Sequence, residues 1–289
     1  MQTLRKHRLC AWIVASLLLS GCGRSSVRPQ GALQIKGSDT MVNLVQAWAE
    51  AFMQQQPTVL VSVTGGGSGT GIASLLNGTT DIASASRPMS ASEREQARAQ
   101  GWTPQEMTVA LDGLAVVVHP NNPVSRLTVD QLADMFTGTI ANWRDVGGSD
   151  APIVLLSREV NSGTHVYFKE HVLRHGDAKG VAEYAPAALL LPSSQAIADE
   201  VAHNAQAIGY YGMGYLSPKQ KALAVAKDAR SLFVAPVIAA VRDGSYPIAR
   251  PLFFYTRDAT AGARQQFIDF VLSPEGQRVV SEQDFVPVH

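Results

Sequence analysis

A stretch rich in glycine, serine and threonine, between Val63 and Pro88, contains residue types that can hold a small anion. Its consecutive glycines, Gly65 to Gly67, let the backbone approach a ligand closely and adopt positive φ. The following Ser68-Gly69-Thr70 is typical of a helix start, where free N–H groups and the helix dipole favour an anion. A tight turn without a ligand explains the same residues equally well.

These glycines do not match the known phosphate and nucleophile motifs. A Walker A loop requires Lys followed by Ser or Thr after its last glycine, whereas Ile72 follows Gly71. The dinucleotide spacing GxGxxG is absent, and the nucleophile elbow GxSxG fails because Thr70 stands where its last glycine belongs. The stretch therefore predicts a generic anion-binding turn.

Two further stretches repeat this chemistry. Gly37-Ser38-Asp39-Thr40 precedes a run with apolar residues at helical spacing, and SREVNSGT (157–164) follows the apolar strand predicted at 153–156. Three such helix starts, together with Arg87 and Arg158, can converge on one oxyanion. Taken singly, each start is also explained by N-capping.

Several motifs resemble those of the phosphate-binding proteins that serve ABC importers. They are GSDTM, GGGSGTGIASLLNGTTDIASASRP, SREVNSGTHVYF, LTVDQLADMFTGTIANWRDVGG, AIGYYGMGYL, YPIARPLFFYT and SPEGQRVVSEQDFVPV, and they cover nearly all of the chain after Leu33. The resemblance implies an α/β fold of the type II periplasmic-binding-protein kind, with two lobes, a ligand cleft between them and two hinge crossings. It also implies a binding protein, not an enzyme.

The resemblance further implies which residues bind phosphate. It places Arg158, Ser162, Gly163, Thr164, Thr40, the backbone N–H of Met41 and Ser68 on the anion, and we add Ser38, Asp39, Ser86 and Arg87 as further candidates. Arg158 is the strongest candidate, because a guanidinium can bind an oxyanion through two parallel N–H groups. Arg87 fits two roles equally well, contact with the anion or bracing of its loop. No metal and no cofactor are expected.

Ser86 departs from a common pattern of that family, in which many members carry an aspartate at this position. That carboxylate accepts the proton of HPO₄²⁻ and disfavours sulfate, which has no proton to give. Other members carry Ser-Arg, as here, so discrimination between the two anions is left open. Asp39 stands at a helix start, where a carboxylate most often caps the first turn, and we favour that role. The alternative is that Asp39 faces the cleft and supplies the missing acceptor.

The N-terminus has the features of a lipoprotein signal peptide. Arg5, Lys6 and Arg8 precede an apolar run, 9–19, that is too short to span a bilayer stably. Leu19-Ser20-Gly21-Cys22 resembles a bacterial lipobox, whose cysteine is acylated by chains such as palmitate. We expect removal of residues 1–21, lipidation of Cys22 and a flexible tether over 22–31. An ordinary secreted chain with a chance cysteine is the alternative.

Removal of residues 1–21 leaves 268 residues, enough for two compact lobes. It takes away three basic residues and no acidic one, so that 21 Lys and Arg stand against 24 Asp and Glu, a net charge of −3. Without a basic stripe, such a chain is unsuited to nucleic acid. Alternating strand and helix patterns predict parallel sheets. We expect 32–114 and 246–289 to form lobe 1 and 115–245 to form lobe 2.

The leading functional hypothesis is a monomeric, lipid-anchored receptor at the cell envelope, which captures inorganic phosphate and delivers it to the membrane permease of an ABC importer. The alternatives are a receptor for sulfate, tungstate or molybdate, a phosphatase, and a surface adhesion protein without a transport role. A phosphatase is disfavoured because hydrolysis requires metal ligands or a nucleophile with its base. His171 and His175 have the i, i+4 spacing of a helical metal site but lack the HExxH motif.

Overall fold

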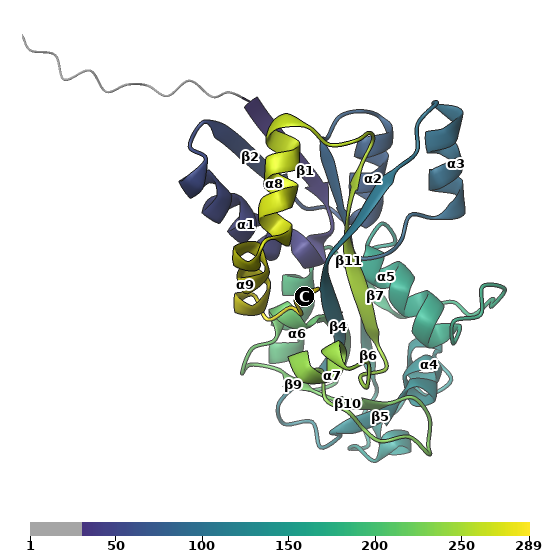
Figure 1. Ribbon diagram of the computed structural model, residues 1–289. Coiled ribbons are helices and arrows are strands. Elements are labelled where there is room, and N and C mark those ends of the chain that lie inside the picture. The colour runs from purple at the N-terminus through teal and green to yellow at the C-terminus, as the bar shows by residue number, and fades with distance from the viewer. Residues whose placement is uncertain (1–30) are drawn as a thin grey trace, which may run out of the picture.

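A computed structural model describes residues 31–289 (Figure 1). The predictions for the signal peptide, for Cys22 and for nearly all of the tether lie outside these residues. In the part of the chain that is described, no helix is both long enough and apolar enough to cross a membrane.

Strands and helices alternate through the first part of the chain, as predicted. The strands are β1 (Gly31–Gly37), β2 (Val59–Thr64), β3 (Ile82–Ala85), β4 (Gln105–Val118), β5 (Arg126–Thr128), β6 (Val154–Arg158), β7 (Leu189–Leu191), β8 (Ala207–Gly212), β9 (Lys221–Ala222), β10 (Ala224–Ala226) and β11 (Ala249–Thr256). The helices are α1 (Val42–Gln55), α2 (Ser68–Leu76), α3 (Ala91–Ala99), α4 (Val129–Thr137), α5 (Gly163–Phe168), α6 (Ser194–His203), α7 (Ile238–Arg242), α8 (Gly262–Leu272) and α9 (Pro274–Glu282). Short 3-10 turns lie at Asp39–Met41, Trp143–Val146 and Met213–Tyr215, and a π-helical turn at Lys169–Leu173.

Nine strands form a mixed sheet in the order β2-β1-β3-β11-β4-β8-β6-β7, with β9 beside β4, and β10 pairs with β5 in a separate two-stranded sheet of the described residues. β1 is parallel to β2 and β3, and β6 is parallel to β7 and β8. The two long central strands, β4 and β11, run antiparallel to each other and to their neighbours β8 and β3. The prediction of parallel sheets is therefore wrong at the centre, because β4 carries the chain from one half of the molecule to the other and β11 brings it back.

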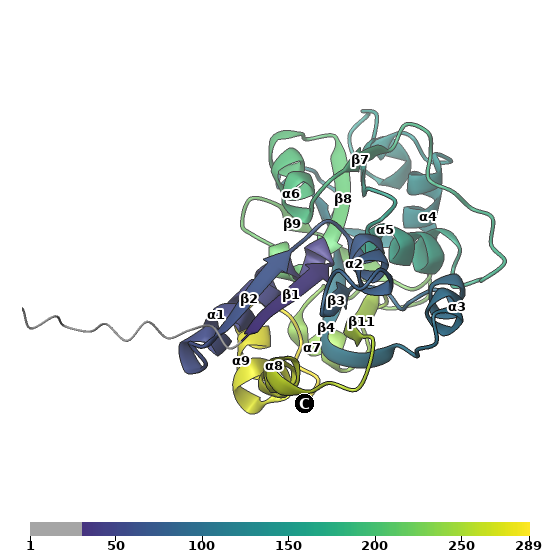
Figure 2. The same cartoon turned by 90° about the horizontal axis from the view of Figure 1, so that it is seen from above.

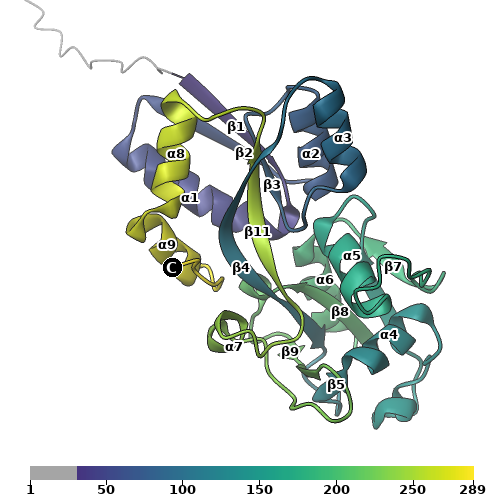
Figure 3. The ribbon, with the colours of Figure 1, turned by 45° about the vertical axis from the view of Figure 1, so that its right-hand side comes forward.

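The molecule has two lobes joined by these two crossing strands (Figures 1 and 3). Lobe 1 contains β1–β3 with α1, α8 and α9 on one side of the strands and α2 and α3 on the other (Figures 2 and 3). Lobe 2 contains β5 to β8 with α4, α5 and α6. The two-lobed α/β fold with two crossings is thus confirmed, while the residue boundaries given above for the lobes stay predictions.

Each lobe buries apolar side chains on both faces of its strands, which is what a layered α/β architecture requires. In lobe 1 the two clusters centre on Trp48 and Phe267 and on Leu75 and Trp102. In lobe 2 they centre on aromatic residues such as Phe136, Phe168 and Tyr210, and on aliphatic ones such as Val117 and Ile197. Each lobe therefore has hydrophobic packing of its own.

The structure can be compared with the local sequence patterns at two capping boxes and at the histidine pair His171 and His175. Capping boxes at Ser90 and Thr128 begin α3 and α4, and each is visible in the sequence as Ser or Thr followed three residues later by Glu or Gln. His171 lies on the helical segment formed by α5 and the π-helical turn, but this segment ends at Leu173, and His175 beyond it has a positive φ of 50°. The two imidazoles therefore do not share a helical face.

Candidate anion-binding site

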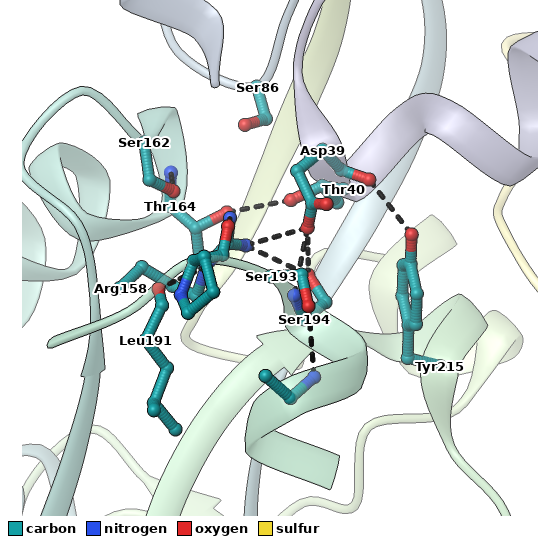
Figure 4. Close-up of polar contacts among 12 residues, drawn as sticks. Asp39, Thr40, Ser86, Arg158, Ser162, Thr164, Leu191, Ser193, Ser194 and Tyr215 are labelled. Atoms are coloured by element: carbon teal, nitrogen blue, oxygen red, sulfur yellow. Dashed lines mark hydrogen bonds and ion pairs between the residues drawn. The ribbon is translucent and has the colours of Figure 1, made fainter. Parts of the chain in front are cut away.

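Hydroxyl groups from both lobes meet at the boundary between them (Figure 4). Thr40 Oγ1 of lobe 1 lies 2.7 Å from Thr164 Oγ1 of lobe 2. Ser68 Oγ lies 3.3 Å from Ser86 Oγ and accepts a hydrogen bond of 3.0 Å from the Ser86 backbone N–H. All four side chains are buried. The structure thus brings together four of the residues expected at the site.

Two helix starts position these hydroxyls. Ser68 is the first residue of α2 and follows Gly67, whose φ is 96°. Ser162 caps α5 by accepting a hydrogen bond of 3.2 Å from the Thr164 N–H. Between them, Gly163 permits the close approach of the lobes, since an added Cβ would lie 2.3 Å from Ser68 Oγ and 2.7 Å from Ser86 Oγ.

The guanidinium of Arg158 is buried and largely engaged within lobe 2. Its Nε donates to the Leu191 carbonyl at 3.3 Å, Nη1 to Ser194 Oγ at 3.0 Å and Nη2 to the Pro192 carbonyl at 2.9 Å. Three of the five N–H groups of the side chain are thereby used, so the expected free fork for an anion is not present in this conformation. Burial lowers the pKa of Arg158, while the nearby Asp39 carboxylate acts in the opposite direction.

Asp39 does not cap its own turn. Its Oδ2 accepts from the N–H of Ser194 at 2.8 Å and from Ser194 Oγ at 3.0 Å, and lies 2.9 Å from Nη1 of Arg158 (Figure 4). Residue Ser38 precedes the 3-10 turn, and no side chain caps it. The favoured capping role was wrong, because lobe 2 offers this carboxylate a guanidinium and the N-terminus of α6, both stronger partners than a single local N–H.

The remaining expected residues differ in how their polar groups are paired. Ser38 Oγ is buried and has no hydrogen-bond partner among the described residues. The Met41 N–H donates to the Ser38 carbonyl at 3.1 Å. Arg87 donates to both carboxylate oxygens of Glu93, at 2.8 and 2.7 Å, and to the Pro88 carbonyl. Of the two roles considered for Arg87, this geometry favours bracing of the loop.

Arg250 and Asp112 were missed in the sequence, although they are the most deeply buried ion pair of the described residues. Arg250 donates from Nε and Nη2 to Asp112 Oδ2, from Nη1 to the Ser86 carbonyl, and from Nη2 to Thr164 Oγ1. A signal was present, since Arg250 is the lone charged residue of β11 and Asp112 lies in the apolar part of β4, where a buried charge requires a partner.

Contacts that join the lobes were also missed. Asn161 Nδ2 donates to the Gly66 carbonyl at 2.8 Å, and the Asn161 carbonyl accepts from the Gly69 N–H at 2.9 Å. Tyr215 OH donates to the Asp39 carbonyl at 2.8 Å. No sequence pattern marks these residues, because the contacts depend on how the two lobes meet.

A buried polar network lies beneath the site in lobe 2. Ser157 Oγ is 3.2 Å from His165 Nδ1 and 2.7 Å from Tyr210 OH, and Tyr184 OH donates to the His165 carbonyl. Burial lowers the pKa of His165 to about 4, so that this imidazole is neutral at neutral pH. Ser157 and His165 directly adjoin Arg158 and Thr164, and the network therefore supports both of these site residues.

Nothing in the described chain suggests a metal centre, since residues 31–289 contain no cluster of three or more His, Cys, Asp or Glu side chains that could hold an ion. The chemistry that the site offers is hydrogen-bond donation from hydroxyl groups, backed by arginines that are already paired with carboxylates. Such an arrangement can bind and enclose a small oxyanion.

Comparisons with known proteins agree with this geometry. The chain matches the model of the PBP superfamily domain over residues 24–275. It is 32% identical over 275 residues to the phosphate-binding protein PstS of Pseudomonas aeruginosa, covering 89% of this chain and 83% of that protein. It is also 32% identical over 271 residues to PstS of Bacillus subtilis, covering 93% and 85%.

Solved structures of phosphate-binding proteins are also similar to this chain. A protein from Clostridium perfringens, solved with bound phosphate, superimposes with a TM-score of 0.80 at 32% identity, covering 89% of this chain and 100% of that one. An ABC-type phosphate transport receptor from Vibrio cholerae gives a TM-score of 0.70 at 31% identity, covering 89% and 99%. Fold and site together define a two-lobed substrate-binding protein. The chain belongs to the phosphate-binding protein family of the PBP superfamily.

Proposed function

We propose that this protein binds inorganic phosphate between its lobes and delivers it to the membrane permease of an ABC importer. The observation that carries the proposal is the meeting of hydroxyls from both lobes, Thr40, Ser68 and Ser86 from one and Thr164 from the other, around Gly163. An anion that leaves water needs donors on every side, and hydroxyl and backbone N–H groups supply them without adding net charge.

Ser38 gives independent support. A buried hydroxyl without a partner costs about 1–3 kcal/mol, and such groups are rare in native proteins. Ser38 Oγ is one of them among the described residues. An oxygen of a bound anion would provide the missing partner, which fits the role expected for this residue.

Phosphate is favoured over sulfate, tungstate or molybdate by the relatives and by one carboxylate. The similar proteins of Pseudomonas aeruginosa and Bacillus subtilis are named for phosphate binding. In the described residues, every hydrogen bond of the Asp39 carboxylate falls on Oδ2. Oδ1 is therefore available as the acceptor for the phosphate proton, whereas the Ser86 hydroxyl can donate as well as accept.

The anchoring of the protein is a second part of the proposal. Acylation of Cys22 would attach the chain to a bacterial membrane, with the lobes facing the periplasm or the exterior. The residues between Cys22 and β1, which begins at Gly31, reach at most about 30 Å when fully extended. A monomer on such a short tether stays close to a permease in the same membrane. A role in surface adhesion without transport is the alternative.

Calorimetric titration of the delipidated protein tests the proposal. We expect about micromolar or tighter phosphate affinity, since several charge-assisted hydrogen bonds of about 1.5–3 kcal/mol each can offset dehydration of the anion. Arg158→Ala should weaken binding on the order of a hundredfold, because it leaves the Asp39 carboxylate short of its cation. Arg94→Ala, at an ion pair with Glu106 in lobe 1, is the matched control.

Two results would contradict the proposal. Equal or tighter binding of sulfate would indicate a receptor for another oxyanion, and hydrolysis of p-nitrophenyl phosphate would indicate an enzyme. Wild-type affinity in Arg158→Ala would remove this residue from the site.

A further inference from the structure

Arg250 occupies the point where the chain crosses between the lobes. On β11 it stands directly opposite Asp112 of β4 in the register of the two strands. Its Nε and Nη2 donate to Asp112 Oδ2 at 3.0 and 2.8 Å, and Asp112 Oδ1 accepts from the Met213 N–H at 3.1 Å. Both side chains are almost completely buried, with 1% and 0% exposed. The guanidinium is therefore held in one orientation by a cross-strand partner.

The rest of this guanidinium faces the candidate anion site. Nη1 donates to the Ser86 carbonyl of lobe 1 at 3.1 Å, and Nη2 donates to Thr164 Oγ1 of lobe 2 at 3.0 Å. Thr40 Oγ1 lies 3.5 Å from the same Nη2. A single side chain thus contacts the loop of Ser86 and both threonine hydroxyls that meet across the lobes.

The direction of these hydrogen bonds has a chemical consequence. A guanidinium carries only donors, so Thr164 Oγ1 must act as an acceptor toward Arg250. If Thr40 donates the 2.7 Å hydrogen bond between the two threonines, Thr164 accepts from both Arg250 and Thr40 and keeps its own hydrogen for a different partner. A phosphate dianion offers mainly acceptors. Because Thr164 Oγ1 already accepts a hydrogen bond from Arg250, its O–H is oriented to donate to that anion.

Asp112 makes this arrangement compatible with burial. An unpaired guanidinium in the interior would be costly, and the adjacent carboxylate balances its charge. The Arg250–Asp112 pair therefore orients hydrogen-bonding groups of the site and adds no net charge to it. In this respect it differs from Arg158, whose carboxylate partner, Asp39, belongs to the other lobe.

We propose that Arg250, held by Asp112, is a positioning residue that fixes the hydroxyl of Thr164 as a donor to the bound phosphate. This inference rests on the proposed function. It has a consequence that a purely structural role lacks. A site whose Thr164 hydroxyl is fixed as a donor prefers HPO₄²⁻ to H₂PO₄⁻, which has an additional hydrogen to place.

A double-mutant cycle tests the inference with Arg250→Lys and Thr164→Val. A lysine ammonium keeps the charge beside Asp112 but cannot supply the planar fork that reaches Asp112, Ser86 and Thr164 together. We expect each single variant to weaken phosphate binding by about tenfold or more. The double variant should bind no more weakly than Thr164→Val alone, because Arg250 acts through that hydroxyl.

The pH profile of phosphate affinity provides the second readout. Wild-type affinity should rise as the pH passes upward through the second ionisation of phosphate, and Arg250→Lys should flatten that rise. Arg94→Lys, the same change at the lobe 1 ion pair with Glu106, should change neither the affinity nor the profile.

The outcomes separate the two proposals. If the wild type binds no phosphate, the proposed function fails. If it binds phosphate, but the losses in the cycle multiply and the pH profile of Arg250→Lys matches the wild type, then Arg250 is only structural and the inference is overturned. Should Arg250→Lys not fold, the paired replacement Asp112→Asn with Arg250→Gln removes both buried charges together and takes its place in the cycle.

Discussion

The carboxylate of Asp39 and the guanidinium of Arg158 meet across the boundary between the lobes, with 2.9 Å between Oδ2 and Nη1. The arginine side chain is 1% exposed and that of Asp39 is 15% exposed. The N-terminus of α6 adds two hydrogen bonds to the same carboxylate oxygen. This contact joins a residue expected to select the ligand to one expected to bind it, so a change in Asp39 should affect both selectivity and lobe closure.

Asp39→Asn should reduce the preference for phosphate over sulfate by about tenfold or more, because an amide presents a hydrogen where the carboxylate offers only acceptors. Phosphate and sulfate affinities of the two proteins, measured at one pH and salt concentration, give the ratio. Asp81→Asn is the matched control, since Asp81 accepts from the Gln34 N–H in lobe 1, away from the site. An unchanged ratio in a folded Asp39→Asn protein would show that another group accepts the phosphate proton.

Gly163→Ala should weaken phosphate binding by at least about tenfold, because its Cβ would press on Ser68 Oγ at 2.3 Å and hold the lobes apart. Small-angle scattering should then show less contraction on addition of phosphate than in the wild type. Gly31→Ala provides the control, as an added Cβ there meets nothing within 4 Å. Wild-type contraction in Gly163→Ala would mean that the lobes do not close on this glycine.

Acidification should destabilise the protein through His165, whose pKa burial lowers from 6.5 to about 4. Between pH 6.5 and about pH 4 this imidazole is protonated in the unfolded chain but not in the native protein. The free energy of unfolding therefore decreases as the pH is lowered through this range. The full loss amounts to about 3 kcal/mol. Urea unfolding across this range should show a smaller fall for His165→Gln than for the wild type. The exposed His203, changed to Gln, should leave the fall unaltered.

Cys22→Ser should release the protein from the membrane fraction. Each acyl methylene that enters a bilayer contributes about 0.8 kcal/mol, so several chains anchor a protein stably. Fractionation of cells and the mass of the processed protein are the measurements. A variant that still pellets with the membranes, with an unchanged mass, would place the anchor elsewhere.

The elements and the site stretches were predictable because their signals are local. Capping boxes at Ser90 and Thr128 and the glycine-rich stretch before α2 each depend on a few neighbouring residues. The partners of Asp39 and Arg250 were not predictable, since they depend on how the lobes meet and on the register of β4 with β11. The same reason explains the incorrect cap at Asp39, because a local pattern cannot weigh a distant guanidinium.

The arginines around the site are each matched by a carboxylate, Arg158 by Asp39, Arg250 by Asp112 and Arg87 by Glu93. A phosphate ion that diffuses toward the site therefore meets little excess positive charge beyond the Debye length of about 8 Å at physiological ionic strength. Long-range attraction contributes little to its arrival, and the association rate should respond only weakly to added salt. Tight binding must then come mainly from slow dissociation of the anion from the site.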